Sequence, residues 1–529
     1  MRKINRLFLL LTFAATTSAS FGQSGIGPIT TSVANANQRV GHPPTIIADG
    51  FQIKTVTKGE VQLENPSGLI YKFGYLNDFP PQLIEATKTE PDENTYLVMD
   101  NPGGPTPNFD YGRHFLFQGH ENSHDLAYIT RVNLDVHDPA HRITLLTPPG
   151  DDGLTHFNSI DGSTYNPFTH TLLFTQETSF PIGGVIQVTT SWPPVTNRLD
   201  GILGSSAYEG VHPDDRGNIL LQEDAGGVSV NVDPFDPDSP KAARQPNSFV
   251  FRFLPYDISD LSQGGKLQAL QVFVDGEPLV FHADDPVGDV FSVKQKTLRT
   301  PGTSYPVRWV TVHDTAVDGF EPFNANAAAK AALATPFKRP ENSQFAPGSK
   351  FRTFFFDETG DTSADSGNRP ELAARGAWGS LFRVDLTIDR NSGLISIFAM
   401  GDAVHAAFDN LTFADANTLL AGEDRGDTLH KQLNTLDSIW AFPLDGSPAL
   451  RFVALGRDLA SEIDAAYLDQ GTQGFQNEGD NETTGVHVSA GSITTRGMPG
   501  TMGNLINPRA FFTQQHGYNT LYRIAYPKK

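Results

Sequence analysis

Short apolar runs bounded by Gly, Pro, Asn or Asp recur along the chain, and they predict β-strands. The runs are rich in aromatic and β-branched residues, which favour strands over helices. The clearest are Arg113–Gln118, Ser248–Leu254, Arg352–Phe356, Ser380–Leu386, Leu394–Met400 and Asn519–Ala525. Helical patterns are few, the best being Asn324–Ala334 and Leu459–Leu468, and both fit insertions between strands. The pattern therefore predicts an all-β protein with loop and short helical insertions.

The strands recur in a unit that begins and ends with an acidic residue. Within each unit a short strand, a polar turn and a second apolar strand separate the two acids. The copies run from Asp161 to Glu177, Glu209 to Glu223-Asp224, Glu341 to Asp357-Glu358, Asp409 to Glu423-Asp424 and, with a long insertion, Glu482 to Gly517. Two strands joined by a turn run antiparallel, so both acids of a unit lie at the same end of the hairpin.

Radial repetition of this unit predicts a β-propeller, because the acidic ends then surround one central channel. Glu177 and Glu223 are 46 positions apart, which is about the length of one four-stranded blade. Five or six blades fit the length, and we expect one propeller domain over residues 46–529. A pair of β-sandwiches is the alternative, but it would not explain the shared acidic pattern.

The first 45 residues have a different character. Residues 1–22 are typical of a secretory signal, with Arg2, Lys3 and Arg6 before the apolar run Leu7–Ala15. Residues 23–45 are rich in Ser, Thr, Gly and Asn, and we expect a flexible lead-in. No later stretch reaches the ~18 apolar residues that a membrane span needs. The expected location is therefore periplasmic or secreted, without a membrane span.

Composition narrows the chemistry. The 529 residues carry a formal net charge of −21, which disfavours nucleic acid as a partner and attracts divalent cations. The chain has no Cys, so disulfides, thiolate ligands and a thiol nucleophile are excluded. No GxSxG, Walker or dinucleotide motif occurs. The oligomeric state stays open.

The paired acids have two interpretations. One acid per blade can cap the hairpin by accepting backbone N–H groups. Acids at both ends of most units would repel one another in a poorly solvated site unless a cation neutralised them. We therefore expect a metal site, with calcium as the hard cation that carboxylate oxygens suit.

The segment His120-Glu121-Asn122-Ser123-His124 matches HExxH, the motif of zinc proteases. That motif requires a helix, whereas an apolar strand-like run precedes it and the segment has poor helix formers. We interpret Glu121 as the acid at the end of a strand and a metal ligand, with His120 as a second candidate ligand. The acidic stretch Asp357–Asp365 lacks EF-hand spacing and is expected to be a solvated loop.

Arg339-Pro340-Glu341 opens one of the units. Pro stiffens the backbone, so a guanidinium and a carboxylate would project from a fixed segment. A planar guanidinium beside metal-binding acids suits a phosphoryl oxygen, although it could also merely neutralise the acids.

Spaced motifs over roughly residues 110–520 resemble the PhoX-type alkaline phosphatases, a family of exported bacterial proteins. The matching pieces are His120-Glu121, Thr175-Gln176-Glu177, Glu209 with Glu223-Asp224, Arg339-Pro340-Glu341, Phe408-Asp409-Asn410, Asn481 to Gly485 and Gln515-His516-Gly517. The resemblance implies a six-bladed propeller that hydrolyses phosphomonoesters at a channel-mouth site with two irons and several calcium ions. It implies metal ligation by Glu177, Glu209, Glu341, Asp409 and Glu482, and phosphate binding by Arg339.

The chain departs from the family pattern at two places. The family's Thr-Cys-Glu-Glu is Thr175-Gln176-Glu177-Thr178 here, and a family His is replaced by Tyr208. Loss of the iron-ligating Cys favours calcium over iron. The sequence leaves three functions open: a metal-dependent phosphoesterase acting on a small phosphorylated substrate, a calcium-stabilised propeller with a binding role, and a calcium-dependent hydrolase such as a lactonase.

Overall fold

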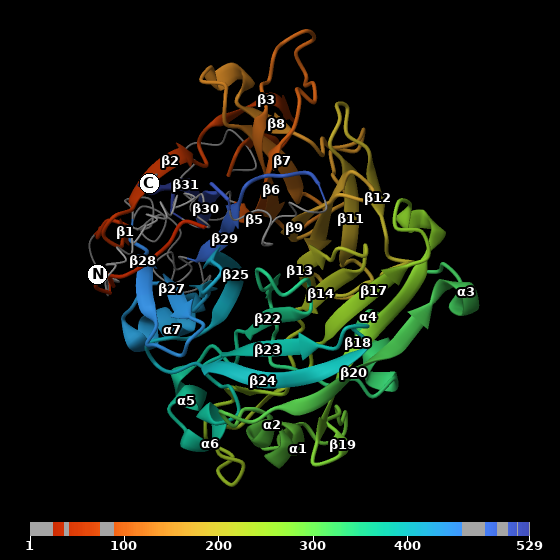
Figure 1. The fold of residues 1–529 in the computed structure, drawn as a ribbon, viewed down its shortest axis with the longest axis vertical. Coiled ribbons are helices and arrows are strands. Elements are labelled where there is room, and N and C mark those ends of the chain that lie inside the picture. The colour runs from red at the N-terminus through yellow and green to blue at the C-terminus, as the bar shows by residue number, and fades with distance from the viewer. Residues whose placement is uncertain are drawn as a thin grey trace, which may run out of the picture.

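Six blades of antiparallel strands surround a central axis in the computed structural model of the protein (Figure 1). The structure describes residues 25–35, 42–74, 89–457, 482–494, 506–515 and 517–527. The predicted signal and the predicted helix at Leu459–Leu468 lie outside the described residues. The predicted six-bladed, all-β propeller is confirmed.

The first three blades follow in chain order, each with its inner strand first. The first holds β5 (Glu90–Val98), β6 (His114–Glu121), β7 (Tyr128–Asn133) and β8 (Ile143–Leu145). The second holds β9 (Ile160–Asn166), β10 (Thr171–Gln176), β11 (Gly184–Thr189) and β12 (Thr196–Arg198). The third holds β13 (Tyr208–Pro213), β14 (Ile219–Glu223), β17 (Val250–Pro255) and β18 (Gly265–Val274).

The other three blades repeat this order. The fourth holds β21 (Ser343–Phe345), β22 (Thr353–Glu358), β23 (Ser380–Leu386) and β24 (Ser392–Met400). The fifth holds β25 (Phe408–Asp415), β26 (Thr418–Glu423), β27 (Ser438–Pro443) and β28 (Leu450–Ala454), with β1 (Ile46–Ile47) at its edge. The sixth holds β29 (Thr483–Ser489), β30 (Arg509–Gln514) and β31 (Thr520–Ala525).

An N-terminal strand closes the ring. Strand β2 (Gln52–Thr57) pairs antiparallel with β31, with Gln52 opposite Ala525. An N-terminal and a C-terminal strand therefore share the last blade, and β31 is paired on both sides. The inner strands β5, β9, β13, β21, β25 and β29 contact one another in that order around the ring.

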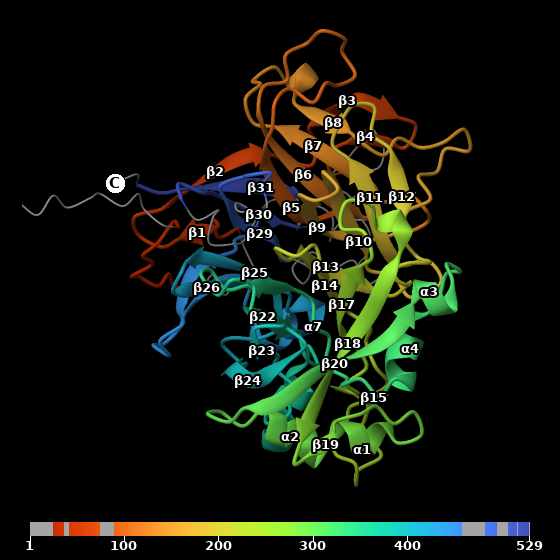
Figure 2. The same cartoon turned by 45° about the vertical axis from the view of Figure 1, so that its right-hand side comes forward.

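Insertions are concentrated within the third blade and between it and the fourth blade. Strand β20 (Tyr305–Asp314) pairs with both β18 and β24 and joins the two blades into one sheet (Figure 2). The same stretch holds β15 (Ser229–Val230), β16 (Ala243–Arg244), β19 (Glu277–Pro278), η3 (Leu261–Gln263), α1 (Pro286–Val290), α2 (Val293–Leu298), α3 (Thr315–Asp318) and α4 (Ala325–Ala331). Elsewhere lie β3 (Gln62–Ser67), β4 (Ile70–Lys72), η2 (Pro139–His141), α5 (Ala364–Gly367), α6 (Pro370–Ala373) and α7 (Gly426–Leu433). Helix α4 falls within the predicted helix at Asn324–Ala334.

The core lies between neighbouring blades, so most strands are buried on both faces. In β30, Phe511 packs with residues of the first blade, whereas Phe512 packs with residues of the fifth. Alternate residues of a strand point to opposite faces, which explains the uninterrupted apolar runs in the sequence. Each of the six predicted runs coincides with an observed strand to within two residues at either end, apart from the end of β6, which extends three residues further, to Glu121. None of the helices in the described ranges is long and apolar enough to cross a membrane.

Candidate metal centre

A β-bulge turns the inner strand of most blades at its acidic residue. In β13, Glu209 and Gly210 lie between the pairs Tyr208–Glu223 and Val211–Leu221, so two residues oppose one. The same irregularity occurs at Asp92-Glu93, Asp161-Gly162, Asp409-Asn410 and Gly485-Val486. A bulge bends the strand and redirects a side chain.

Glycine at the bulge lets neighbouring inner strands approach closely. A Cβ added to Gly162 would lie 1.8 Å from the Glu209 carbonyl oxygen in the next blade. A Cβ on Gly210 would lie 2.4 Å from Gln222 Oε1 and 3.0 Å from Asn342 Cα. Neither position has room for a side chain, and this close approach brings the acids of adjacent blades together.

The acids of the six blades form one cluster at one end of the central channel. Two groups have ligand atoms within 4.8 Å of one another: Asp92, Glu121 and Asp161, and Glu177, Glu209 and Asp224. A further series connects them, because Glu209 lies within hydrogen-bonding distance of Glu341 and Asp409, and Asp409 does the same with Glu482. Asp424 is in electrostatic contact with Glu482. We call this set the carboxylate cluster.

The structure therefore brings together all six acids that the sequence nominated as metal ligands: Glu121, Glu177, Glu209, Glu341, Asp409 and Glu482. It adds Asp92, Asp161, Asp224 and Asp424. Asp161 begins a repeated unit, and Asp224 and Asp424 each end one, so the repeat itself could have nominated them. Asp92 was not predicted, because Pro91 at the start of β5 is untypical of a strand.

Burial makes it unfavourable for the carboxylates of this cluster to be charged. Burial raises the pKa of Glu209 well above its usual value, and the charge of Glu341 raises that pKa further. The pKa of Asp161 rises for the same reason, with Asp92 and Glu121 as the nearest like charges. Asp224 is the exception, because Arg339 outweighs burial and holds its pKa below the usual value.

Several carboxylate oxygens are also without a donor. Among the described residues, Asp92 Oδ1, Asp161 Oδ1 and Asp409 Oδ2 are buried and accept no hydrogen bond. Buried carboxylates normally have a hydrogen-bond donor or a cation as partner. An oxygen-only donor set with unpartnered oxygens fits a hard cation such as Ca²⁺.

Arg339 is the cation that the chain itself places beside the cluster. Its Nε and Nη2 donate to the carboxylate of Asp224 at 2.9 and 2.7 Å, and Nη2 lies 3.2 Å from Glu341 Oε1. The Arg339 carbonyl accepts from Thr359 N at 2.9 Å, and Pro340 restricts the backbone that follows. Within the described part of the chain, Nη1 makes no hydrogen bond, and the side chain is 17% exposed.

No protein-family model matches this chain, and no curated protein matches its sequence. Among solved structures, the chain is similar to Pseudomonas fluorescens PhoX in complex with vanadate, a transition state analogue. That match has 10% sequence identity and a TM-score of 0.54, and it covers 96% of this chain and 98% of the other. The chain shares the fold of the PhoX structure. A match to the calcium structure of Trichoderma reesei family AA12 has 10% identity, a TM-score of 0.30 and coverage of 93% and 99%.

In three blades, the acid that ends the second strand has a structural role. Glu223 accepts from Phe249 N at 3.0 Å, Glu423 accepts from Ala406 N at 3.0 Å, and Glu358 accepts from Lys338 N at 2.9 Å. Each caps a backbone segment, as the alternative interpretation of the repeat expects. In the pairs Glu223-Asp224 and Glu423-Asp424, the Glu is therefore a cap, and the following Asp belongs to the cluster.

Two expectations from the sequence are wrong. The stretch Asp357–Asp365 is not a solvated loop, because Glu358 is fully buried against Arg299 and Asp361 binds Lys338 Nζ at 2.7 Å. His120 is not a second ligand, because it is buried between strands, where Nε2 contacts Thr130 Oγ1 at 2.8 Å. The expectation that the HExxH segment is not a helix is confirmed, because β6 extends to Glu121.

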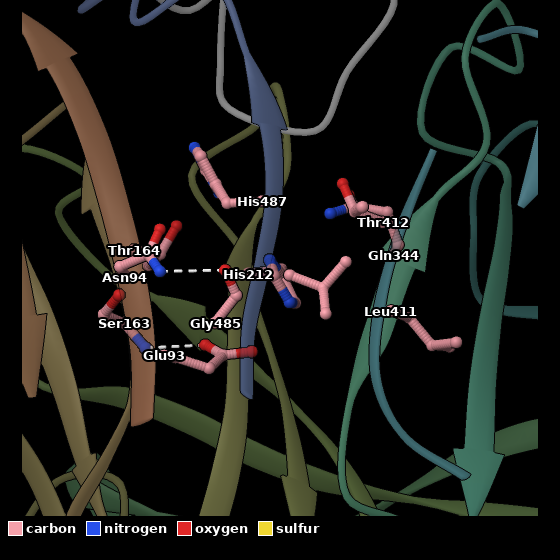
Figure 3. A pocket seen from close by; sticks show the side chains of 11 residues that line it. Glu93, Asn94, Ser163, Thr164, His212, Gln344, Leu411, Thr412, Gly485 and His487 are labelled. Carbon is pink, nitrogen blue, oxygen red and sulfur yellow. Dashed lines mark hydrogen bonds between the residues drawn. The ribbon is translucent and has the colours of Figure 1, made fainter. Parts of the chain in front are cut away.

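A narrow polar channel continues from the cluster along the propeller axis. All six inner strands line this narrow space with residues that follow their acids (Figure 3). Glu93 accepts from Ser163 N at 2.7 Å, and Asn94 Nδ2 donates to the Gly485 carbonyl at 2.8 Å, so hydrogen bonds join neighbouring inner strands. The channel is thereby held together directly below the cluster.

Proposed function

We propose that the protein is an exported, metal-dependent phosphoesterase that hydrolyses phosphomonoesters at the mouth of the propeller channel. The observation that carries the proposal is the position of Arg339, whose guanidinium lies among the buried carboxylates with Nη1 available. A planar guanidinium is suited to the oxygens of a phosphoryl group.

The residues that would hold metal ions are those of the carboxylate cluster. Asp92, Glu121 and Asp161 would form one position, and Glu177, Glu209 and Asp224 another. Divalent cations at such positions can stabilise negative charge on phosphoryl oxygens and activate water for attack. The charge of the cluster would also keep an anionic substrate away unless cations are bound.

Arg339 would hold the phosphate, and Asp224 would orient Arg339. The paired hydrogen bonds that Arg339 donates to Asp224 fix the plane of the guanidinium before substrate arrives. Donors that are already fixed in place stabilise the charge that develops in the transition state without having to move. This preorganisation is the main source of electrostatic catalysis. The likeness to PhoX, whose structure holds a transition-state analogue, supports this chemistry.

Calcium fits the donor set better than iron. Gln176 stands where the resembling family has Cys, and its Oε1 accepts from Asn158 N at 3.2 Å. The side chain thus binds backbone, and every nominated ligand is an oxygen donor. This observation also supports a second candidate function, a calcium-stabilised propeller or a calcium-dependent hydrolase such as a lactonase.

The decisive assay is hydrolysis of an aryl phosphate by purified protein supplied with Ca²⁺, with and without iron. We expect Arg339→Met and Glu341→Ala to reduce kcat/KM by about 100-fold. Elemental analysis of each variant would separate metal loss from loss of phosphate binding. Equal rates for wild type and both variants would refute the phosphoesterase, and hydrolysis of a lactone but not a phosphate would favour the second candidate.

A further inference from the structure

A second arginine, Arg244, reaches the same region from an insertion in the third blade. It ends the short hairpin β15–β16, which follows Asp224 in the chain. The hairpin is fixed by a small core in which Val230 and Ala243 pack with Val290 of α1 and Leu372 of α6. The base of the Arg244 side chain is therefore well anchored.

The backbone of Arg244 is also tied to the segment that carries Arg339. Arg244 N donates to Asp361 Oδ1 at 3.1 Å, and the same oxygen accepts from Lys338 Nζ at 2.7 Å. On the other side, the neighbouring Gln245 donates from Nε2 to Asp289 Oδ2 at 2.8 Å. Both arginines are thus positioned by one hydrogen-bonded framework.

Among the described residues, the guanidinium of Arg244, by contrast, makes no hydrogen bond and no ion pair, and the hydrogen bond to Asp361 comes from the backbone N. A Cβ added to Gly226 would lie 3.0 Å from Arg244 Nη1, so this nitrogen packs beside the backbone two residues after Asp224. Burial and then the charge of Arg339 lower the pKa of Arg244, while Asp224, Asp361 and Glu341 act in the opposite direction.

Other buried arginines of the described residues have partners for their guanidinium groups. Arg299, Arg390 and Arg425 each contact a carboxylate at 2.5 to 2.7 Å. Arg131 and Arg252 have no carboxylate partner in the described ranges, but each donates to a backbone carbonyl oxygen. A partly desolvated guanidinium beside another cation costs free energy unless an anion compensates it. Among the described residues, Asp224, Asp361 and Glu341 act on Arg244 through their charge without bonding to it, so a directly bonded anion would come from a ligand.

We propose that Arg244 binds a second anionic group of the substrate, next to the phosphate held by Arg339. This inference rests on the phosphoesterase function proposed above and narrows its substrate class. The preferred substrates are phosphomonoesters that carry another phosphate or carboxylate within a few bonds of the scissile phosphate. Arg339 would bind the reacting group, and Arg244 would bind the leaving-group side.

The test compares two phosphonates that differ by one charge, 3-phosphonopropanoate and propylphosphonate. Their binding to calcium-loaded protein is measured by calorimetry, which needs no turnover. We expect wild type to bind 3-phosphonopropanoate about tenfold more tightly, as expected for one charged hydrogen bond. Arg244→Met should remove that preference and leave propylphosphonate affinity unchanged, whereas Arg244→Lys should retain part of it.

Arg369→Met is the matched control. The Arg369 side chain is 47% exposed, and its Nη1 lies 3.7 Å from Oδ2 of Asp233, which belongs to the insertion that carries Arg244. This variant should leave both affinities unchanged, and thermal unfolding of each variant checks that the fold is intact. If folded Arg244→Met and Arg244→Lys keep the wild-type preference for 3-phosphonopropanoate, the role of Arg244 is overturned, but the phosphate site is not. Failure of wild type to bind either phosphonate would overturn the phosphate site and this inference together.

Discussion

Asp224 and Arg339 form a paired contact between two blades, with Nε–Oδ1 at 2.9 Å and Nη2–Oδ2 at 2.7 Å. Asp224 follows β14 of the third blade, and Arg339 precedes β21 of the fourth. The residues are 115 positions apart in the chain. The site is therefore assembled only when these two blades are packed correctly.

Asp224→Asn should loosen the orientation of Arg339. Loss of one charged partner corresponds to roughly 10- to 100-fold in an equilibrium or a rate. We expect kcat/KM for an aryl phosphate to fall by about that factor, measured at saturating Ca²⁺. Asp236→Asn, an exposed position in the neighbouring insertion, is the control and should have no effect. Full activity of Asp224→Asn would show that the paired contact does not position the arginine.

Metal removal should make stability depend strongly on pH. The raised pKa values of Glu209, Asp161 and Glu341 mean that the folded, metal-free state binds more protons than the unfolded state. Stability then falls as pH rises above the unfolded carboxyl pKa of about 4. We expect the metal-stripped protein to have a lower Tm at about pH 8 than at about pH 5.

Calcium should reverse this loss, because bound cations replace protons as partners of the carboxylates. Calorimetric scans with chelator and with Ca²⁺ at both pH values provide the measurement. A metal-stripped protein that is equally stable at both pH values would mean that the cluster ionises without penalty.

Gly162→Ala should destabilise the propeller. Its Cβ would meet the Glu209 carbonyl oxygen at 1.8 Å, and neither inner strand can move without disturbing a blade. We expect a loss of about 2–3 kcal/mol in the free energy of unfolding, measured in urea. Gly150→Ala is the control, because its nearest neighbour would be Asp152 Oδ1 at 3.4 Å in a loop. Equal midpoints for the two variants would argue against close packing of the inner strands.

Arg299→Met should be costly in a different way. Arg299 and Glu358 form a fully buried ion pair at 2.5 Å, and removal of the arginine leaves an uncompensated charge. We expect a loss of about 3–5 kcal/mol in the free energy of unfolding. The double variant Arg299→Met/Glu358→Gln should recover part of that loss in the same denaturation experiment. No recovery would indicate that packing of the arginine, and not its charge, is what stabilises the fold.

The sequence could predict the propeller because the hairpin geometry is local. An acid before one strand and another after the next must lie at the same end of the hairpin, whatever surrounds it. The uninterrupted apolar runs, such as Arg352–Phe356, also reported burial on both faces of a strand. These two signals depend on neighbouring residues alone, and the structure confirms the fold they predicted.

Which acids of each pair belong to the carboxylate cluster, and which cap the backbone, could not be predicted in the same way. Whether Glu223 or Asp224 faces the channel depends on the strand register and on the bulge at Glu209-Gly210. Asp92 escaped notice because Pro91 interrupts the strand pattern and a long loop replaces the tight turn before β6. The burial of Asp361 depends on its ion pair with Lys338. Lys338 lies outside the acidic stretch that contains Asp361, so the stretch alone could not reveal the pair.

The central claim is that the carboxylate cluster holds divalent cations, and counting bound calcium tests it most directly. Equilibrium dialysis followed by elemental analysis would compare wild type with Asp161→Asn and Glu177→Gln, one variant for each compact group. The account predicts at least two tightly bound ions in wild type, one for each group, and fewer in each variant. A wild-type protein that retains no divalent cation, or variants that retain as many as wild type, would contradict it.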